Sequence, residues 1–240
     1  MYKIIIYCIF ISCFQTQASA ISVSELLPGD IIFWKALDQE DRAGHVAVVT
    51  ITSKIPQNIR IAHATDNPKY YSFVETYIPP SKKLITQNKY YYVIRIADPS
   101  FKQQLLNEIQ TLLKRKIPFN SKSEKLMNQW DDSMVGYPAE VKLKLQNVLF
   151  QHKKLKLNIP DEAFMCSEVI IVALQKSWLK SKGMDLPKSL QLDPILCPPS
   201  TMLFALERDL RNFKNIGELR VEDYKFSFAE KKSYNREKSN

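Results

Sequence analysis

The strand-like and helix-like segments of this 240-residue chain occupy different parts of the sequence. Short runs rich in β-branched and aromatic residues come first, and turn signals such as Pro28-Gly29 separate them. We expect strands at residues 31–34, 45–51, 59–64, 71–78 and 90–96. Because the connections between these runs are short, they predict an antiparallel β-meander at the start of the fold.

Runs with apolar residues at helical spacing follow the strands. They predict helices near residues 105–113, 141–149, 169–174 and 201–210. Asp98-Pro99-Ser100 supplies a cap and an early proline for the first of these helices. Strands followed by helices are typical of the α+β class, so we expect an antiparallel sheet packed on helices in a single domain, residues 21–229.

The polar segment 121–160 separates the first helix from the later ones. Within it, an amphipathic helix is predicted to bury its apolar residues and point its lysines to solvent; these apolar residues are Val141, Leu145, Val148 and Leu149. His152, at the end of this helix, is interpreted as a surface residue. We expect a helical insertion that selects substrate or covers the site, and a surface elaboration far from the site is the alternative. The charged stretch 230–240 is expected to be a flexible tail.

Three residues are candidates for a nucleophilic site, with a thiol, a base and an orienting group: Cys166, His45 and His63. The run that begins at Cys166 is apolar around most of a helix surface, so the thiol is predicted to lie at the start of a buried helix. Backbone N–H groups there favour a thiolate and can bind an oxyanion. His45 and His63 lie in consecutive strands, which can bring the two rings side by side. One imidazole can then take the thiol proton while the other orients it.

Structural interpretations of the same residues stay open at this point. An isolated cysteine is most often a small core residue, and each histidine alone is as often a hydrogen-bonded structural residue. Cys166 and Cys197 could form a disulfide, which would inactivate the thiol. A zinc site built from His45, His63 and Cys166 is less favoured, because these residues lack metal-type spacing. We therefore expect no metal and no cofactor.

The first twenty residues have the features of a cleavable export signal. Met-Tyr-Lys is followed by an apolar run from Ile4 to Phe14 and by an Ala-Ser-Ala end, which predicts a mature chain that begins near Ile21. The expected location is therefore periplasmic or secreted. Cys13 leaves a lipoprotein signal as the alternative. The apolar run is too short to span a bilayer and no other run is longer, so no transmembrane segment is expected.

The charge balance indicates which partners suit the surface. The chain has 34 Lys and Arg against 25 Asp and Glu, which gives a formal net charge of +9. Such a surface favours anionic partners, for example cell-wall polymers or lipid head groups. The basic residues are dispersed, however, and they form no arginine-rich or aromatic-interleaved stripe. A nucleic-acid partner is therefore not expected.

Four short segments together resemble the NlpC/P60 superfamily of papain-like cysteine hydrolases. They are residues 28–33 (PGDIIF), 44–49 (GHVAVV), 63–64 (HA) and 166–170 (CSEVI). In standard members the cysteine helix precedes the histidine strands, whereas here it follows them. This order is similar to that of the circularly permuted branch, which includes the YaeF/YiiX-like proteins and the relatives of lecithin:retinol acyltransferase. The resemblance implies a circularly permuted papain-like fold.

By this resemblance, Cys166 is the nucleophile, His45 the base and His63 the polar third member, a position that is often glutamate in the YiiX-like branch. It implies a cysteine peptidase or amidase that cleaves an amide bond through an acyl-thioenzyme. With the export signal, a peptidoglycan peptide is the first expected substrate. An acyl-lipid substrate for the same triad, in ester cleavage or acyl transfer, is the second expectation. A non-catalytic binding module with a Cys166–Cys197 disulfide is the third.

Overall fold

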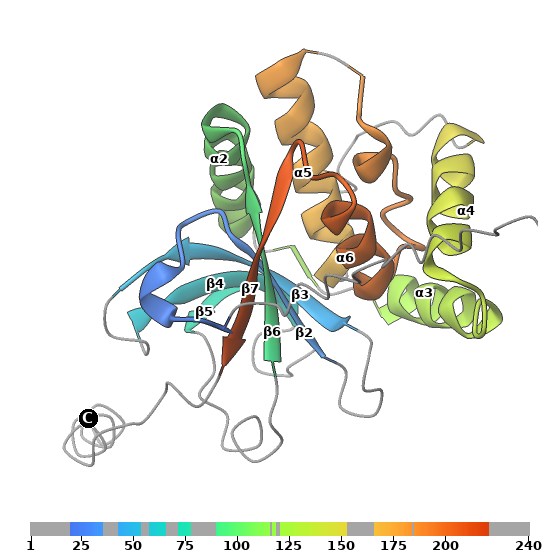
Figure 1. Cartoon of the computed structure of the whole chain (residues 1–240), viewed down its shortest axis with the longest axis horizontal. Helices are drawn as coiled ribbons and strands as arrows, with labels where there is room; N and C mark the ends of the chain where they lie inside the picture. Colours follow the sequence, from blue (N-terminus) through green and yellow to red (C-terminus); the bar gives the residue numbers. More distant parts are fainter. Residues whose placement is uncertain are drawn as a thin grey trace, which may run out of the picture.

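The computed structural model describes residues 20–35, 43–53, 58–65, 72–77, 90–115, 117–118, 121–152, 166–183 and 185–220. Residues 1–19 of the expected export signal and the expected tail, 230–240, lie outside these residues. The described part is an α+β fold, in which one sheet packs against a group of helices (Figure 1). No helix within it is long and apolar enough to cross a lipid bilayer.

A seven-stranded sheet has the strand order β1-β7-β6-β2-β3-β4-β5. The strands are β1 (Ala20–Ile21), β2 (Ile31–Lys35), β3 (Ala43–Ile51), β4 (Arg60–Thr65), β5 (Ser72–Tyr77), β6 (Tyr90–Ile96) and β7 (Phe213–Arg220). Neighbours are antiparallel except β1, which runs parallel to β7. The predicted meander is correct for β2 to β5 but wrong for β6, which pairs with the open edge of β2. Strand β7 was not predicted, because Asn215 and Gly217 interrupt its apolar residues.

The helices are α2 (Pro99–Arg115), α3 (Ser121–Ser133), α4 (Ala139–His152), α5 (Cys166–Lys182) and α6 (Pro199–Glu207), with 3-10 turns at Val23–Glu25 and Lys188–Leu190. Helices α2 and α5 pack against each other beside the sheet, and α6 contacts both α5 and α4 (Figure 1). The Asp98 side chain accepts the N–H of Phe101 at 2.7 Å, so the predicted cap of α2 is confirmed. Gly183, at φ +59°, follows the last residue of α5.

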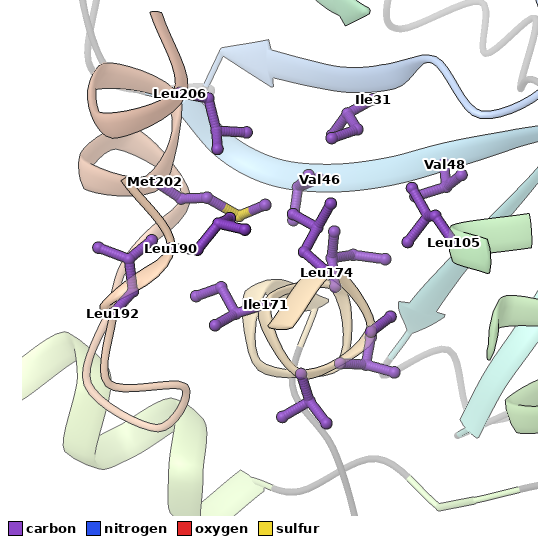
Figure 2. Close-up of a cluster of buried hydrophobic side chains, with 14 of the residues drawn as sticks. Ile31, Val46, Val48, Leu105, Ile171, Leu174, Leu190, Leu192, Met202 and Leu206 are labelled. Carbon is purple, nitrogen blue, oxygen red and sulfur yellow. The ribbon is translucent and has the colours of Figure 1, made fainter. Parts of the chain in front are cut away.

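Alternate residues of the strands enter two different cores. On the helix-covered face, Val46 points towards Leu174 of α5, and Val48 lies beside Leu105 of α2 (Figure 2). The opposite face carries a smaller apolar cluster, whose members are Ile21, Leu26, Ile32, Ala47, Val49, Ile59, Ile61, Val93 and Leu219. Because α5 packs directly on β3, core packing fixes the position of its first residue relative to this strand.

The turn before β2 is held by a buried ion pair. Asp30 has no exposed surface, and its carboxylate accepts two hydrogen bonds of 2.8 Å from the Arg95 guanidinium of β6. It also accepts the N–H of Leu27 at 2.8 Å. Gly29 has φ +89°, and a Cβ there would lie 2.5 Å from Cγ of Lys102. The Pro-Gly-Asp sequence therefore joins β2 to β6 and allows α2 to approach closely.

The helical insertion is present as α3 and α4, but α4 buries a different face from the predicted one. Lys142 and Gln146 are its buried residues. Leu145 and Val148, which we expected to be buried, are 40% and 46% exposed. The prediction of a helix is thus confirmed, and the prediction of its apolar contact face is wrong for Leu145 and Val148, whereas Val141 and Leu149 are half-buried. His152 is exposed, as expected.

Polar contacts explain the orientation of α4. The Gln146 side chain accepts the backbone N–H of Asp193 at 3.1 Å and donates to the carbonyl of Leu196 at 3.1 Å. Lys142 forms an ion pair with Asp131 of α3 at 3.3 Å. Part of the surface that α4 covers is therefore a backbone segment with hydrogen-bonding groups to satisfy, which a leucine could not satisfy. Leu143 and Phe150 of the same helix pack, partly buried, against the helix-side core.

Candidate active site

Cys166 is the first residue of α5, and it is 7% exposed. As predicted, the helix is buried around most of its surface as far as Trp178. The sulfur lies close to the backbone N–H groups of Val46, Ser167 and Cys166 itself, all of which favour the thiolate form. The thiol is thus held between the start of a buried helix and the backbone of β3.

The thiol lies where β3 and β4 separate. In the described part of these strands, pairing extends only as far as the Val48–Ala62 pair, whereas β4 stays paired with β5 over its whole length. On the other side of β3, the N–H of Val49 donates to the carbonyl of Asp30 at 2.8 Å. Because N–H groups alternate in direction along a strand, the N–H of Val46 points towards β4. It meets the cysteine sulfur there, so the start of α5 occupies the opening of a fork between the two strands.

The two histidines contact each other, as the sequence predicted. Nε2 of His45 lies 3.0 Å from Nδ1 of His63, and the ring centroids are 5.2 Å apart in a T-shaped arrangement. Their neighbours Val46, Ala62 and Ala64 all pack in the helix-side core. Because side chains alternate along a strand, both rings leave the sheet on the same, opposite face. This shared direction is what allows one ring to orient the other.

Thr76 of β5 is a third member of this chain of hydrogen bonds. Its hydroxyl oxygen lies 3.0 Å from Nε2 of His63. His63 pairs with Val74, and Thr76 follows two residues later on the same face of the sheet. Thr76 was not predicted, because a threonine in a strand carries no motif of its own. Only the register of β4 against β5 could have indicated it.

Removal from water keeps both imidazoles neutral. Burial lowers the pKa of His63 to about 4. The pKa of His45 is also well below its usual value, first because of burial and then because of the neighbouring His63 ring. At neutral pH each ring therefore carries a single proton, and its other nitrogen has a lone pair that can accept a hydrogen bond or a proton.

Burial also keeps the thiol protonated, because it raises the pKa of Cys166 to about 12. The N–H groups of Val46 and Ser167 offset part of this effect, and the carboxylate of Glu124 adds to it. The site at neutral pH thus holds a neutral thiol and neutral imidazoles. Attack by the sulfur therefore requires a base to remove its proton as the new bond forms.

The structure shows one direct contact between predicted site residues and one contact of Cys166 with the backbone beside His45. His45 and His63 lie within hydrogen-bonding distance of each other, and the thiol of Cys166 lies at the backbone N–H of the residue that follows His45. The sulfur is thus one residue along β3 from the imidazole that is expected to take its proton.

Cys166 and Cys197 are both free thiols, so the disulfide considered as an alternative is not formed. Cys197 is fully buried, and its sulfur lies 3.7 Å from the carbonyl of Pro198. Among the residues that the structure describes, no group of three or more His, Cys, Asp or Glu side chains is arranged to hold a metal ion.

The insertion lies beside the cysteine end of α5. The hydroxyl of Ser167 donates to the sulfur of Met127 in α3 at 3.9 Å. Glu124, one turn earlier in α3, is near enough for its charge to raise the pKa of Cys166. Of the two interpretations of segment 121–160, a distant elaboration therefore does not fit α3. Nothing in the sequence pattern signals this contact, because it depends on how two helices far apart in the chain dock.

Comparison of the chain with models of known protein families, with curated proteins and with solved structures finds no match in any of the three. The chemistry of the site has to be inferred from its own residues. These provide a helix-start thiol at a strand fork, a pair of neutral imidazoles in mutual contact, and a hydroxyl at the far end of that pair.

Proposed function

We propose that this protein is a cysteine hydrolase that cleaves an amide bond through an acyl-thioenzyme. The observation that carries the proposal is the position of the Cys166 thiol at the fork between β3 and β4, the two strands that hold the His45–His63 pair. A structural cysteine needs neither a helix start nor a histidine pair on the adjacent strands. A cysteine nucleophile needs a base with an orienting partner, and backbone N–H groups nearby.

The proposed reaction has two halves. The Cys166 sulfur attacks the substrate carbonyl carbon, and the thiol proton passes to His45. The oxyanion that forms faces the N–H groups at the start of α5. When the carbon–nitrogen bond breaks, His45 returns the proton to the leaving amine. Water then attacks the thioester with His45 again as the base, which releases the carboxylic acid and restores the thiol.

The chain order supports a permuted papain-like enzyme. The histidine strands β3 and β4 precede the cysteine helix α5, and α5 packs on those same strands. This order agrees with the resemblance to the circularly permuted NlpC/P60 branch. With the export signal expected at residues 1–20, a peptide of peptidoglycan is the substrate that we propose first.

Exposed apolar side chains near the site favour a second candidate, an acyl-lipid substrate for the same thiol. Within the described residues, the insertion carries several large apolar side chains that are exposed: Leu126, Val135, Tyr137, Leu145 and Val148. Helix α3 contacts the start of α5, so part of this apolar surface belongs to the element next to the thiol. Acyl chains bind to such surfaces, whereas polar muropeptides do not need them.

Alkylation tests the nucleophile. Iodoacetamide at pH 7 should label Cys166 roughly tenfold faster than Cys197 or more, although both thiols are free and buried. Cys166→Ala should abolish turnover and leave the fold intact, while Cys197→Ala, the matched control, should keep turnover. Equal labelling of both cysteines, or an active Cys166→Ala variant, would exclude Cys166 as the nucleophile.

Paired substrates test the bond. Purified muropeptides and a phospholipid in mixed micelles should be incubated separately with the full-length protein and with Cys166→Ala, and the products identified by mass spectrometry. We expect amide cleavage of the muropeptide by the parent alone. Release of fatty acid without muropeptide cleavage would replace the first substrate class with the second. A thioester adduct on Cys166 would establish the acyl-enzyme in either case.

A further inference from the structure

The hydrogen bonds of the site form one chain across three strands. Nε2 of His45 on β3 lies 3.0 Å from Nδ1 of His63 on β4, and Nε2 of His63 lies 3.0 Å from the hydroxyl of Thr76 on β5. A hydroxyl is the only member of this chain that can donate and accept at a single atom. The end of the chain at Thr76 therefore influences the positions of the protons along its whole length.

Two proton arrangements satisfy this chain. In the first, His45 donates from Nε2 to His63, and His63 donates from its own Nε2 to Thr76. In the second, Thr76 donates to His63, and His63 donates from Nδ1 to His45. Each neutral ring has one proton, so the two contacts must run in the same direction.

Only the first arrangement makes His45 a base towards the thiol. It leaves Nδ1 of His45 without a proton, and this is the nitrogen that does not face His63. The second arrangement puts the proton of His45 on Nδ1, where it blocks proton transfer from Cys166. The direction in which the hydrogen bonds run from His45 to Thr76 thus decides whether the site can react. In a serine protease, the wrong tautomer disables the catalytic histidine in the same way.

We infer that Thr76 is a positioning residue that accepts the Nε2 proton of His63 and thereby holds His45 in the tautomer that can take the thiol proton. Thr76 is only partly buried, so its own hydroxyl proton can point to solvent while its oxygen accepts. This role rests on the proposed hydrolase function, but the tautomers themselves can be measured without any substrate.

The experiment combines nuclear magnetic resonance with kinetics. Long-range ¹H–¹⁵N correlation spectra of the ¹⁵N-labelled full-length protein at pH 7 report which nitrogen of each histidine carries the proton. We expect Nε2–H on both His45 and His63. Thr76→Val keeps the size and β-branching of threonine but removes the hydroxyl. It should move part of His63 to the Nδ1–H tautomer and lower the iodoacetamide alkylation rate of Cys166 and kcat about tenfold, with KM unchanged.

Two further variants separate positioning from general damage. Thr76→Ser restores a hydroxyl and should recover the parent tautomers and most of the rate. Thr50 is also a strand residue, but its hydroxyl donates to the backbone carbonyl of Arg60. Thr50→Val should therefore change neither the histidine tautomers nor the rates.

Three results would overturn the inference. They are a parent protein with Nδ1–H on His63, a Thr76→Val variant with unchanged tautomers and rates, and a Thr76→Ser variant that behaves like Thr76→Val. A protein that hydrolyses no substrate but shows the expected tautomers and their dependence on Thr76 would contradict the proposed function alone.

Discussion

Helices α5 and α4 are both continuous α-helices, yet their fully buried side chains differ in kind: those of α5 are mostly apolar and those of α4 are polar, with Leu143 and Phe150 only partly buried on the core. Helix α5 buries apolar side chains against the sheet and α2, and residues from Val169 to Leu174 are nearly all without exposed surface. Helix α4 buries Lys142 and Gln146 and leaves Leu145 exposed. The difference teaches that apolar patterning locates a helix in the core of this fold but does not orient a helix that covers polar backbone.

The largest expected effect compares one substitution in both helices. Leu174 of α5 has no exposed surface, and Leu145 of α4 is 40% exposed. Leu174→Ala should lower the free energy of unfolding by about 2–5 kcal/mol, because it removes buried methyl groups and leaves a cavity. Leu145→Ala should change it by less than about 0.5 kcal/mol. Urea unfolding of both variants measures the difference, and similar losses would mean that the two helices are packed alike.

In a second pair of substitutions, making a buried position of α4 more apolar is expected to destabilise the protein. Gln146→Leu makes α4 more apolar, but it removes the partners of the Asp193 N–H and the Leu196 carbonyl. We expect it to lower the free energy of unfolding by about 2–3 kcal/mol. Leu145→Gln, one position earlier, should be nearly neutral because its side chain reaches solvent. A stabilising Gln146→Leu in the same urea experiment would show that polar contacts do not orient α4.

The sequence predicts the fold well where alternation or helical spacing coincides with burial. Strands β2 to β6 and helices α2, α5 and α6 were expected close to their observed positions because their buried residues are mostly apolar. The pairing of β6 with β2 was not predicted, since strand order depends on which sheet edge is open. The contact face of α4 was not predicted either, because its partner is the backbone of residues 193–196, which no side-chain pattern reveals.

In the candidate site too, some contacts were predicted from the sequence and others were not. The contact between His45 and His63 was predicted, because consecutive antiparallel strands place such residues together. Thr76 and Glu124 were not, because their places depend on the register of β5 and on the docking of α3 beside α5. The roles of Cys166, His45 and His63 in catalysis stay predictions that the proposed experiments address.

The third prediction compares a half-buried histidine of the sheet with an exposed histidine of the insertion. The pKa of His63 is lowered to about 4 by burial, whereas it is about 6.5 in an unfolded chain. Between these values the unfolded chain binds more protons, so stability falls as the pH drops through this window. From pH 7 to pH 5 the free energy of unfolding should therefore fall by about 1–2 kcal/mol more in the parent than in His63→Gln. This range allows for the part of His63 that is in contact with solvent.

Urea unfolding at the two pH values measures this loss, with His152→Gln on α4 as the control for removing a histidine. His45 contributes in the same direction in both proteins, and because the His63 ring also lowers the pKa of His45, the difference between the proteins reports the loss of His63 together with its effect on His45. If the parent and His63→Gln lose the same stability on acidification, then His63 is not kept neutral by burial.

The smallest expected effect tests whether the insertion and the cysteine helix are electrically coupled. Glu124 of α3 raises the pKa of Cys166, and a neutral glutamine should lower that pKa. Alkylation requires the sulfur to lose its proton, so iodoacetamide at pH 7 should label Cys166 roughly two- to fivefold faster in Glu124→Gln than in the parent. Glu140→Gln removes a carboxylate of α4 that pairs with Arg208 at the surface, and it should leave the rate unchanged.

The two variants distinguish position from net charge, because each removes one negative charge from the insertion. If both accelerate labelling equally, the effect comes from the net charge and not from the place of Glu124 beside the thiol. If only Glu124→Gln accelerates it, the insertion does more than cover polar backbone. One of its side chains then governs how easily the thiol is ionised, and α3 belongs to the site while α4 serves only to anchor it.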